Sequence, residues 1–458
     1  MKYALLPGLL ALLATAQPSR AEGPVVALPT DPTLSRLIAE SLSARPEVLQ
    51  SAAVVHAEGE RAAQADALPD PMLQIGIQND GFTSIQVGRM ETSFISLMAS
   101  QTVPWPGKRG LRKQVADLST TQARYAVTRV RLSTEAEVRR SYWDLVLARD
   151  RLALLDQLAA LWQKSADVAR VRYETAGGAQ SDVLRAQLEL SRLEQRRLGL
   201  EADERASTQA INRSRAHPLA EPIVTTAHIR DLPALTTFAS SFSEPQSLRQ
   251  SPELATARLG TLRAERAVAL AEKSYYPDLT VSAGVMYRGA LPPMWLTTVG
   301  GPLPLFGARS HAVAENRAWG SAAEQEVVAI QQVLRWRTAE RRGAFLALQK
   351  MVDIYQQGLL IQSQATAEST LAQYQVGKVS FASVLEANAA FIADQEGYLE
   401  TVVEAYRILN AQAEISLAPT SLPTGVAGGS GAMPGPGSSS NGASSQSGAP
   451  RGDSPSSM

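Results

Sequence analysis

The sequence predicts a mostly α-helical protein with a small β part, in which a helix, a β-hairpin, a very long helix and a returning helix occur twice. Three observations predict this fold class: long stretches without proline, short stretches in which apolar and polar residues alternate, and motifs that recur about 200 residues later. There is no proline between Pro106 and Pro218 and no glycine between Gly110 and Gly177. A helix of that length extends for roughly 100 Å, which is more than one globular core requires.

The composition excludes several classes of function. The 458 residues include 44 basic and 44 acidic side chains, so no nucleic-acid partner is expected. Cysteine is absent, which excludes disulfides, thiolate metal sites and a cysteine nucleophile. The sequence contains no G-x-S-x-G, no H-E-x-x-H and no phosphate-binding glycine loop, and its four histidines lack metal-ligand spacing. The nine methionines are scattered along the chain, and packing in a core or in a barrel accounts for them. We therefore expect no enzyme activity, no cofactor and no metal site.

The two ends of the chain differ in composition from the rest. Residues 1–21 have the pattern of a signal peptide, with Lys2 before an apolar run and small residues at Ser19-Arg20-Ala21; cleavage after Ala16 is the alternative. Residues 418–458 are rich in Gly, Ser, Pro and Ala, and we expect them to be disordered. The mature protein is therefore expected to be exported.

The first repeat is expected over residues 31–217. It begins with helical sequence at Asp31-Pro32, and a second helix start follows at Pro46. Apolar residues then alternate with polar or small ones in two short runs, at 72–78 and 93–103, which predicts a β-hairpin over 71–104.

A long helix over 107–175 and a returning helix over 180–215 complete this repeat. Thr175-Ala176-Gly177-Gly178 ends the long helix, and Gln180-Ser181-Asp182 offers a cap for the next one. Apolar or small residues recur at heptad spacing in the long helix and predict close packing against another helix: Val138, Ser141, Leu145, Ala148, Leu152, Leu155, Ala159 and Trp162.

Residues 218–245 indicate a connector, and 246–417 repeat the order of the first half. Pro252-Glu253 matches Pro46-Glu47, and Pro277 matches Pro71, both 206 residues apart. Further matches follow at offsets of 200 and 201 residues. They predict a β-hairpin over 277–304, a long helix over 307–375 and a returning helix over 380–416.

The strands are about ten residues long, which suits a tilted strand in an outer membrane. Four strands from one chain cannot close a barrel and would leave exposed edges. Three chains would supply twelve strands. We therefore expect a homotrimer with a 12-stranded β-barrel that contacts outer-membrane lipid.

Beside the duplication, four segments stand out: Gln101–Arg109, Arg172-Tyr173-Glu174, Tyr374-Gln375-Val376-Gly377 and Ser383-Val384-Leu385-Glu386-Ala387. With the duplication, they resemble the TolC-like outer-membrane efflux channels over roughly residues 31 to 416. The Gln101–Arg109 segment looks most like members paired with heavy-metal pumps of the resistance-nodulation-division class. The resemblance implies a homotrimer in the outer membrane, with an α-helical tunnel that extends into the periplasm and contacts a periplasmic adaptor (membrane fusion) protein and an inner-membrane pump.

The same resemblance places the breaks between long and returning helices at the periplasmic tip. The residues it assigns to adaptor docking there are Tyr173, Gly177, Gly178, Ser181, Tyr374, Gly377 and Ser380. The residues it assigns to a tip gate are Asp182, Ser383 and Glu386, with Arg172 and Arg185 as candidate partners of the acids. The alternative is that these residues only cap helices. The first turn departs from the family in having Ala176 where glycine is usual.

Two other functions remain open from the sequence. A type I exit duct for secreted protein would have the same fold, because the pump selects the substrate. A periplasmic coiled-coil adaptor would carry one helical hairpin within a lipoyl-like β-domain. The exported substrate, the pump and the adaptor are not determined by the sequence.

Overall fold

The computed structural model describes residue 28, residues 31–303 and residues 307–419, all within one compact unit. The expected signal peptide and the 420–458 part of the expected tail lie outside the described residues. So does Pro304-Leu305-Phe306, at the end of the second predicted hairpin.

The first half contains four helices and two strands, and its first two helices start where the sequence favours it. Asp31 caps the first helix by accepting a hydrogen bond from the Leu34 N–H at 2.5 Å, and Pro32 and Pro46 occupy first helical positions. The elements are α1 (Pro32–Ala44), α2 (Pro46–Asp66), β1 (Met72–Gln78), β2 (Phe94–Val103), α3 (Lys108–Glu174) and α4 (Gln180–Ser214).

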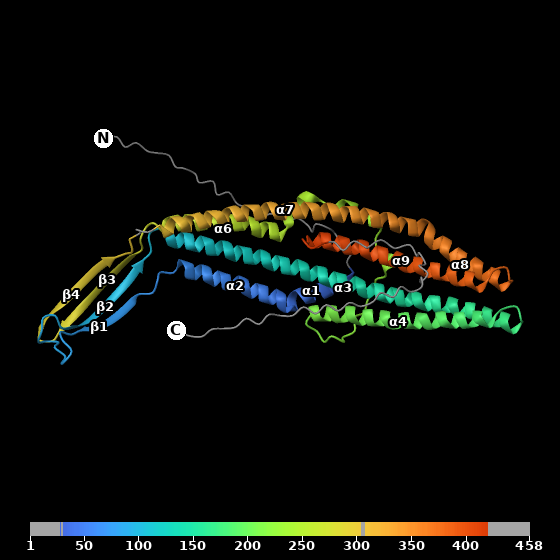
Figure 1. The fold of residues 1–458 in the computed structure, drawn as a ribbon, viewed down its shortest axis with the longest axis horizontal. Helices are drawn as coiled ribbons and strands as arrows, with labels where there is room; N and C mark the ends of the chain where they lie inside the picture. Colours follow the sequence, from blue (N-terminus) through green and yellow to red (C-terminus); the bar gives the residue numbers. More distant parts are fainter. Residues whose placement is uncertain (1–27, 29–30, 304–306, 420–458) are drawn as a thin grey trace, which may run out of the picture. The chain divides into compact units, whose positions relative to one another are not determined.

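The second half repeats this order after a connector of short helices (Figure 1). The connector contains η1 (Ile229–Asp231), η2 (Leu235–Ser241) and α5 (Glu244–Gln250). The repeat contains α6 (Pro252–Lys273), β3 (Leu279–Arg288), β4 (Leu291–Gly300), α7 (Ala308–Ile354), the π-helical turn η3 (Tyr355–Leu359), α8 (Leu360–Gln375) and α9 (Phe381–Glu414). The predicted fold class, mostly helical and duplicated with two β-hairpins, is confirmed.

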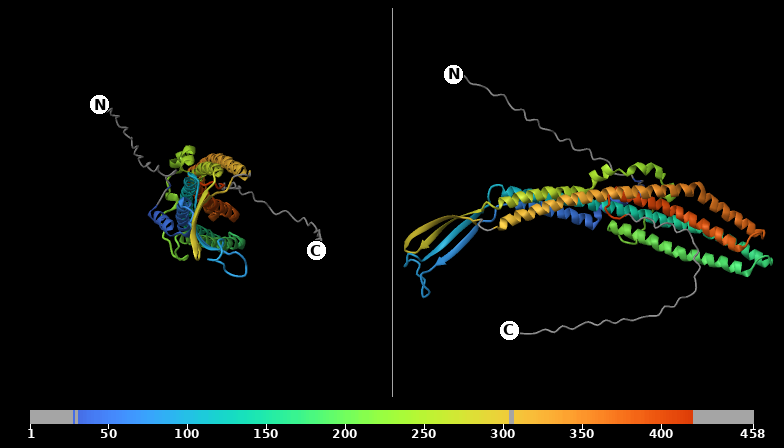
Figure 2. Two further views of the ribbon diagram at one scale, coloured as in Figure 1. Left: turned by 90° about the vertical axis from the view of Figure 1, so that its left-hand side faces the viewer. Right: turned by 45° about the horizontal axis from the view of Figure 1, so that its top comes forward.

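The two hairpins form one antiparallel sheet in the order β1-β2-β3-β4. The central pair joins the two repeats: Leu97 of β2 lies opposite Val285 of β3. Figures 1 and 2 show this sheet at one end of the helices, and in the described part of the chain no helix layer covers either face. Within the described residues β1 and β4 are the outer strands of the sheet, and the outer edge of each lacks a partner strand.

The two faces of the sheet differ in chemistry. Register and alternation place apolar side chains on one face: Leu73, Ile75, Ile77, Ile95, Leu97, Val281, Val285, Tyr287, Trp295 and Val299. The other face carries mainly hydroxyl and amide side chains: Gln74, Gln78, Ser96, Ser100, Thr102, Thr280, Ser282 and Thr298. In β3 the apolar-face residues are exposed and the polar-face residues are half-buried. With no covering layer, this difference indicates that the sheet curves with its polar face on the concave side.

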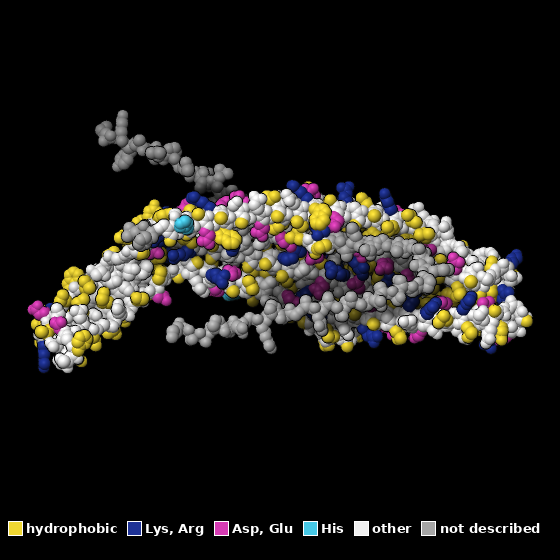
Figure 3. All heavy atoms as spheres, viewed as in Figure 1, with side chains coloured by type: hydrophobic (Ala, Val, Ile, Leu, Met, Phe, Trp, Pro, Cys, Tyr) yellow, Lys and Arg dark blue, Asp and Glu magenta, His cyan; other side chains and the backbone are white. Residues whose placement is uncertain are grey.

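Long helices pack side by side beyond the sheet, and the predicted heptad positions of α3 contribute to their core. Val138, Leu145, Leu155 and Trp162 are buried, and Leu152 is half-buried. The core also takes side chains from α1, α7 and α9: Leu34, Leu37, Leu334, Phe345, Leu348, Leu399, Val403 and Leu409. Figure 3 shows acidic and basic side chains interspersed along the helices. No helix of the described residues combines the length and apolarity needed to cross a membrane.

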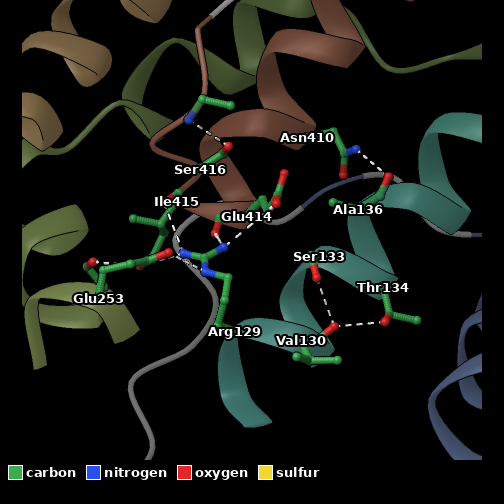
Figure 4. Close-up of polar contacts among 12 residues, drawn as sticks. Arg129, Val130, Ser133, Thr134, Ala136, Glu253, Asn410, Glu414, Ile415 and Ser416 are labelled. Carbon is green, nitrogen blue, oxygen red and sulfur yellow. Dashed lines mark hydrogen bonds and ion pairs between the residues drawn. The ribbon is translucent and has the colours of Figure 1, made fainter. Parts of the chain in front are cut away.

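The C-terminal end of α9 is held by arginines of other helices, as Figure 4 shows for Arg129. Arg129 of α3 donates to the Glu414 carbonyl at 2.9 Å and the Ile415 carbonyl at 3.2 Å, and it pairs with Glu253 of α6. The buried Arg341 of α7 donates to the Ser416 carbonyl. These contacts satisfy carbonyls that a helix end leaves without partners, and they join the two repeats.

The Gln101–Arg109 segment leads from strand β2 into helix α3 and contacts the second repeat. Trp105 stacks on Tyr276 with ring centroids 5.2 Å apart, and its backbone N–H donates to Asp278 Oδ1 at 2.9 Å. The buried Lys108 donates to Asp278 Oδ1 and to the Tyr276 carbonyl, both at 2.7 Å. Here the sheet meets the helices, and residues of both repeats make the joint.

Candidate functional site at the paired helical turns

The turns at the far ends of the two long helices contact each other. The turn between α3 and α4 begins at Thr175, and the one between α8 and α9 begins at Val376. Each closes with the same backbone pattern: Gly177 N–H donates to the Arg172 carbonyl at 2.7 Å, and Lys378 N–H donates to the Gln373 carbonyl at 2.9 Å. This is the hydrogen bond of a Schellman-type helix end.

That helix end requires one residue in the left-handed region in each turn. In the second turn this residue is Gly377, with φ of 75°. In the first turn it is Ala176, with φ of 57°, and not the neighbouring Gly177. The position where the sequence departs from the family pattern is therefore the one where glycine would be least strained.

Arg172 ties the two turns together. Its guanidinium donates to the Tyr374 carbonyl of α8 and, at 2.6 Å, to the Gly177 carbonyl of its own turn. The guanidinium carbon also lies 4.5 Å from the centroid of the Tyr374 ring, a cation–π contact. One side chain thus satisfies carbonyls of both turns and covers an aromatic face.

Tyr374 makes the second link, to α4. Its hydroxyl donates to Asp182 Oδ2 at 3.0 Å, and its ring lies 5.2 Å from the ring of Phe381. Burial, followed by the hydrogen bond and charge of Asp182, raises the pKa of Tyr374 to about 12. Tyr374 therefore remains a neutral donor at neutral pH, and the Asp182 carboxylate is its acceptor.

A small apolar cluster lies beneath these polar contacts and fixes the distance between the helices. Three of its buried members are alanines, which allow close approach of the backbones. The cluster consists of Ala166, Ala169, Ala186, Leu371, Tyr374, Phe381 and Val384.

The other predicted tip residues lie around this centre with fewer contacts. Tyr173 is about half exposed, and Gly177, Ser181, Gly377 and Ser380 are exposed. Gly178 packs on Arg172, since a Cβ built on it would lie 3.1 Å from the Arg172 Cβ.

Ser181 does not cap α4, contrary to the sequence-based expectation. The helix begins at Gln180, and the extended residue before it is Ala179, so Ser181 lies within the first turn. Ser380 does precede α9, and its hydroxyl lies 3.3 Å from that of Ser383.

The predicted gate residues are only partly brought together. Asp182 is held by Tyr374, and within the described residues Arg172 contacts turn carbonyls instead of the acid. Glu386 is exposed, and among the described residues it has no hydrogen bond or ion pair. The tie made by Arg172 and the packing of Phe381 were not predicted. The only sequence indication was that an arginine and an aromatic residue flank the two breaks.

The described residues give no conventional metal centre. No group of three or more His, Cys, Asp or Glu side chains in them is placed to hold a metal ion.

The described residues have the fold of TolC-like outer-membrane channels. The solved outer-membrane channel OprN superposes with a TM-score of 0.72 at 18% identity, covering 84% of this chain and 90% of that one. No family model matches the sequence.

Two curated relatives are proteins of heavy-metal resistance. The nickel-cobalt-cadmium resistance protein NccC of Alcaligenes xylosoxydans xylosoxydans is 26% identical over 325 residues, covering 70% of this chain and 69% of the relative. The cobalt-zinc-cadmium resistance protein CzcC of Cupriavidus metallidurans is 22% identical over 345 residues, covering 75% and 80%.

Proposed function

We propose that three copies of this chain form the outer-membrane channel of a tripartite efflux system and act as a passive exit duct. The observation that carries the proposal is the sheet. One of its faces is apolar and exposed, and in the described part of the chain neither of its edges has a partner strand. Long helical hairpins continue from this sheet. Pairing of β4 with β1 of the next copy would satisfy both edges and turn the apolar faces toward lipid.

The helical hairpins would then extend into the periplasm, with the paired turns at the tip. In this arrangement the exposed turn residues, among them Tyr173, Gly377 and Ser380, face a periplasmic adaptor that connects the channel to an inner-membrane pump. The names of the two relatives support heavy-metal cations as the exported solute.

The tip would also hold the channel closed. The Tyr374–Asp182 hydrogen bond joins the second helical hairpin to the first, and release of this bond allows the hairpins to separate. Asp182 and Glu386 would each recur three times near the axis, and rings of carboxylates in a narrow opening favour cations.

Planar-bilayer recording of the purified full chain tests this proposal. We expect particles of three chains in detergent and a small cation-preferring conductance. Tyr374→Phe keeps the ring but removes the donor. Because a hydrogen bond to a charged group stabilises by about 1.5–3 kcal/mol, this change should raise the open fraction about tenfold or more.

The matched control is Tyr125→Phe, at an exposed tyrosine of α3 away from the turns. It should leave the conductance unchanged, whereas Asp182→Asn with Glu386→Gln should weaken the cation preference. A folded monomer without conductance would refute the channel. An unchanged open fraction in Tyr374→Phe would refute the gate alone.

A further inference from the structure

The methionines of the described residues gather on the sheet. Four of the six lie in its strands, at Met72, Met98, Met286 and Met294. Met90 lies in the β1–β2 loop, and Met351 is the only methionine in a described helix. The methionines are scattered along the sequence, but strand pairing brings four of them onto one sheet from segments that are nearly 200 residues apart.

Strand register places these four side chains in one line across the sheet. Met286 of β3 lies directly opposite Met294 of β4. Met98 of β2 lies two residues from Ser96, the partner of Met286, and Met72 of β1 lies two residues from Gln74, the partner of Met98. Direct partners in a sheet have Cβ atoms about 4.5–5.5 Å apart and diagonal ones about 7–8 Å, within reach of long side chains.

All four methionines are on the polar, concave face. Met98 lies opposite Gln74 and Gly284, and Met286 lies opposite Ser96. The apolar face of the same strands uses Leu, Ile, Val, Tyr and Trp and carries no methionine. The methionine thioethers are therefore not part of the apolar face of the sheet.

The Met98 side chain extends toward β3. A Cβ built on Gly284 would lie 2.5 Å from Met98 Cγ, so the Met98 side chain occupies the space that glycine leaves open. Gly284 lies two residues from Met286 on the same face of β3 and opposite Leu296 of β4. Met98 and Met286 are half-buried and Met294 is about half exposed, so the group remains accessible from the concave side.

The chemistry of this face selects one class of ligand. Thioether sulfur is a neutral, soft donor that favours Cu(I), whereas carboxylate and carbonyl oxygens favour hard divalent cations. In the described strands the other side chains of this face near the line are mostly hydroxyls and amides, together with one leucine and one arginine: Gln74, Ser96, Ser100, Ser282, Thr298, Leu296 and Arg288. No carboxylate of these strands competes there for the cation.

We propose that Met98, Met286 and Met294 bind a soft monovalent metal cation, Cu(I) or Ag(I), on the concave face of the sheet. Met72 continues the line of thioethers to the edge strand β1. This inference depends on the sheet alone and does not require the proposed efflux function.

Silver binding to the purified full chain tests the site directly. The chain has no cysteine, so no thiolate contributes to the signal. We expect at least one Ag(I) bound per chain, with sulfur neighbours in X-ray absorption at the silver edge. The triple variant M98L, M286L, M294L keeps side-chain volume and removes three thioethers, and it should bind Ag(I) at least about tenfold more weakly.

Met351→Leu is the matched control, because Met351 lies in helix α7, outside the sheet. It should bind Ag(I) as the unchanged protein does. If the triple variant loses its folded circular-dichroism spectrum, Met286→Leu alone replaces it. The site would be overturned if the absorption spectrum showed only oxygen or nitrogen atoms next to the bound silver. Equal Ag(I) affinity in the folded methionine variant and in the Met351 control would also overturn it. Loss of binding with normal conductance would leave the proposed channel intact.

Discussion

At the second helical turn, Gly377 combines two constraints. Its φ of 75° lies in the left-handed region, and a Cβ built on it would lie 3.3 Å from Arg172 Nη2. The first turn shows how far such a position tolerates substitution, because Ala176 occupies the same place with φ of 57°. Alanine is therefore compatible with this turn, and bulk at Cβ is the variable to test.

Gly377→Val should open the tip locally. A left-handed conformation costs an ordinary residue about 1–2 kcal/mol, and a β-branched side chain would in addition displace the Arg172 guanidinium from the Tyr374 carbonyl. We expect faster amide hydrogen exchange at residues 373–381 and normal exchange in the sheet. Gly377→Ala is the control and should change exchange less. Equal exchange in the two variants would mean that the hydrogen bonds of Arg172 do not require the space that Gly377 leaves open.

At the scale of elements, the two long helices differ by one residue. Helix α3 spans 67 residues, whereas Ala308–Gln375 is one residue longer and contains the π-helical turn Tyr355–Leu359. A π turn accommodates one extra residue without rotating the helix on either side. This explains why the motif offset changes from 200 residues at the start of the long helix to 201 at its end.

The position of a single-residue deletion should therefore decide its effect. Deleting Gly358 removes the extra residue where it is accommodated, and we expect a normal unfolding temperature. Deleting the exposed Gly343 instead rotates the residues between it and the π turn by about 100°. That takes Phe345, Leu348 and Val352 out of the core.

A thermal melt of both deletion variants in detergent, followed by circular dichroism, compares them. Loss of one buried large side chain alone typically costs about 2–5 kcal/mol, so the Gly343 deletion should unfold at a clearly lower temperature. Equal melting temperatures would show that the π turn does not absorb the extra residue.

At the scale of the whole described unit, the two repeats meet where sheet and helices join. Burial alone would raise the pKa of Asp278, but hydrogen bonds from Lys108 and from the Trp105 N–H outweigh it and lower the pKa below its usual range. The stabilisation from this carboxylate is therefore complete above the ordinary carboxyl pKa. It is lost as the pH falls through the lowered value.

Lys108→Met should destabilise the joint by about 1–3 kcal/mol at neutral pH, because it leaves the Tyr276 carbonyl and one side of Asp278 without a donor. The difference in unfolding temperature from the unchanged protein should narrow as the pH falls through the lowered pKa of Asp278, because the carboxylate that Lys108 contacts is then protonated in both proteins. Lys113→Met is the control, since its exposed pair with Asp66 contributes little. If the difference in unfolding temperature did not change with pH, Asp278 would not be the group through which Lys108 stabilises the protein.

Much of the architecture was predictable because its determinants are local. Proline-free, alanine- and leucine-rich sequence predicts long helices, and alternation predicts strands, since both patterns act within a few residues. The positions of the helix-ending turns were also predictable, because glycines mark both breaks, although the left-handed residue of the first turn is Ala176 and not a glycine. The duplication and the fold class followed from these local patterns taken in order.

The tertiary structure decided which distant residues meet. Pairing of β2 with β3 brings Met98 to Met286 and Met294, and packing of α8 against α4 brings Tyr374 to Asp182. Arg172 binds turn carbonyls, and a π turn absorbs one extra residue, through contacts that no local pattern encodes. By itself the sequence determined the elements, their order and the alternation of each strand. The register between strands and the partner of each buried polar group depend on packing energies summed over segments far apart in the chain, so only the folded structure decided them.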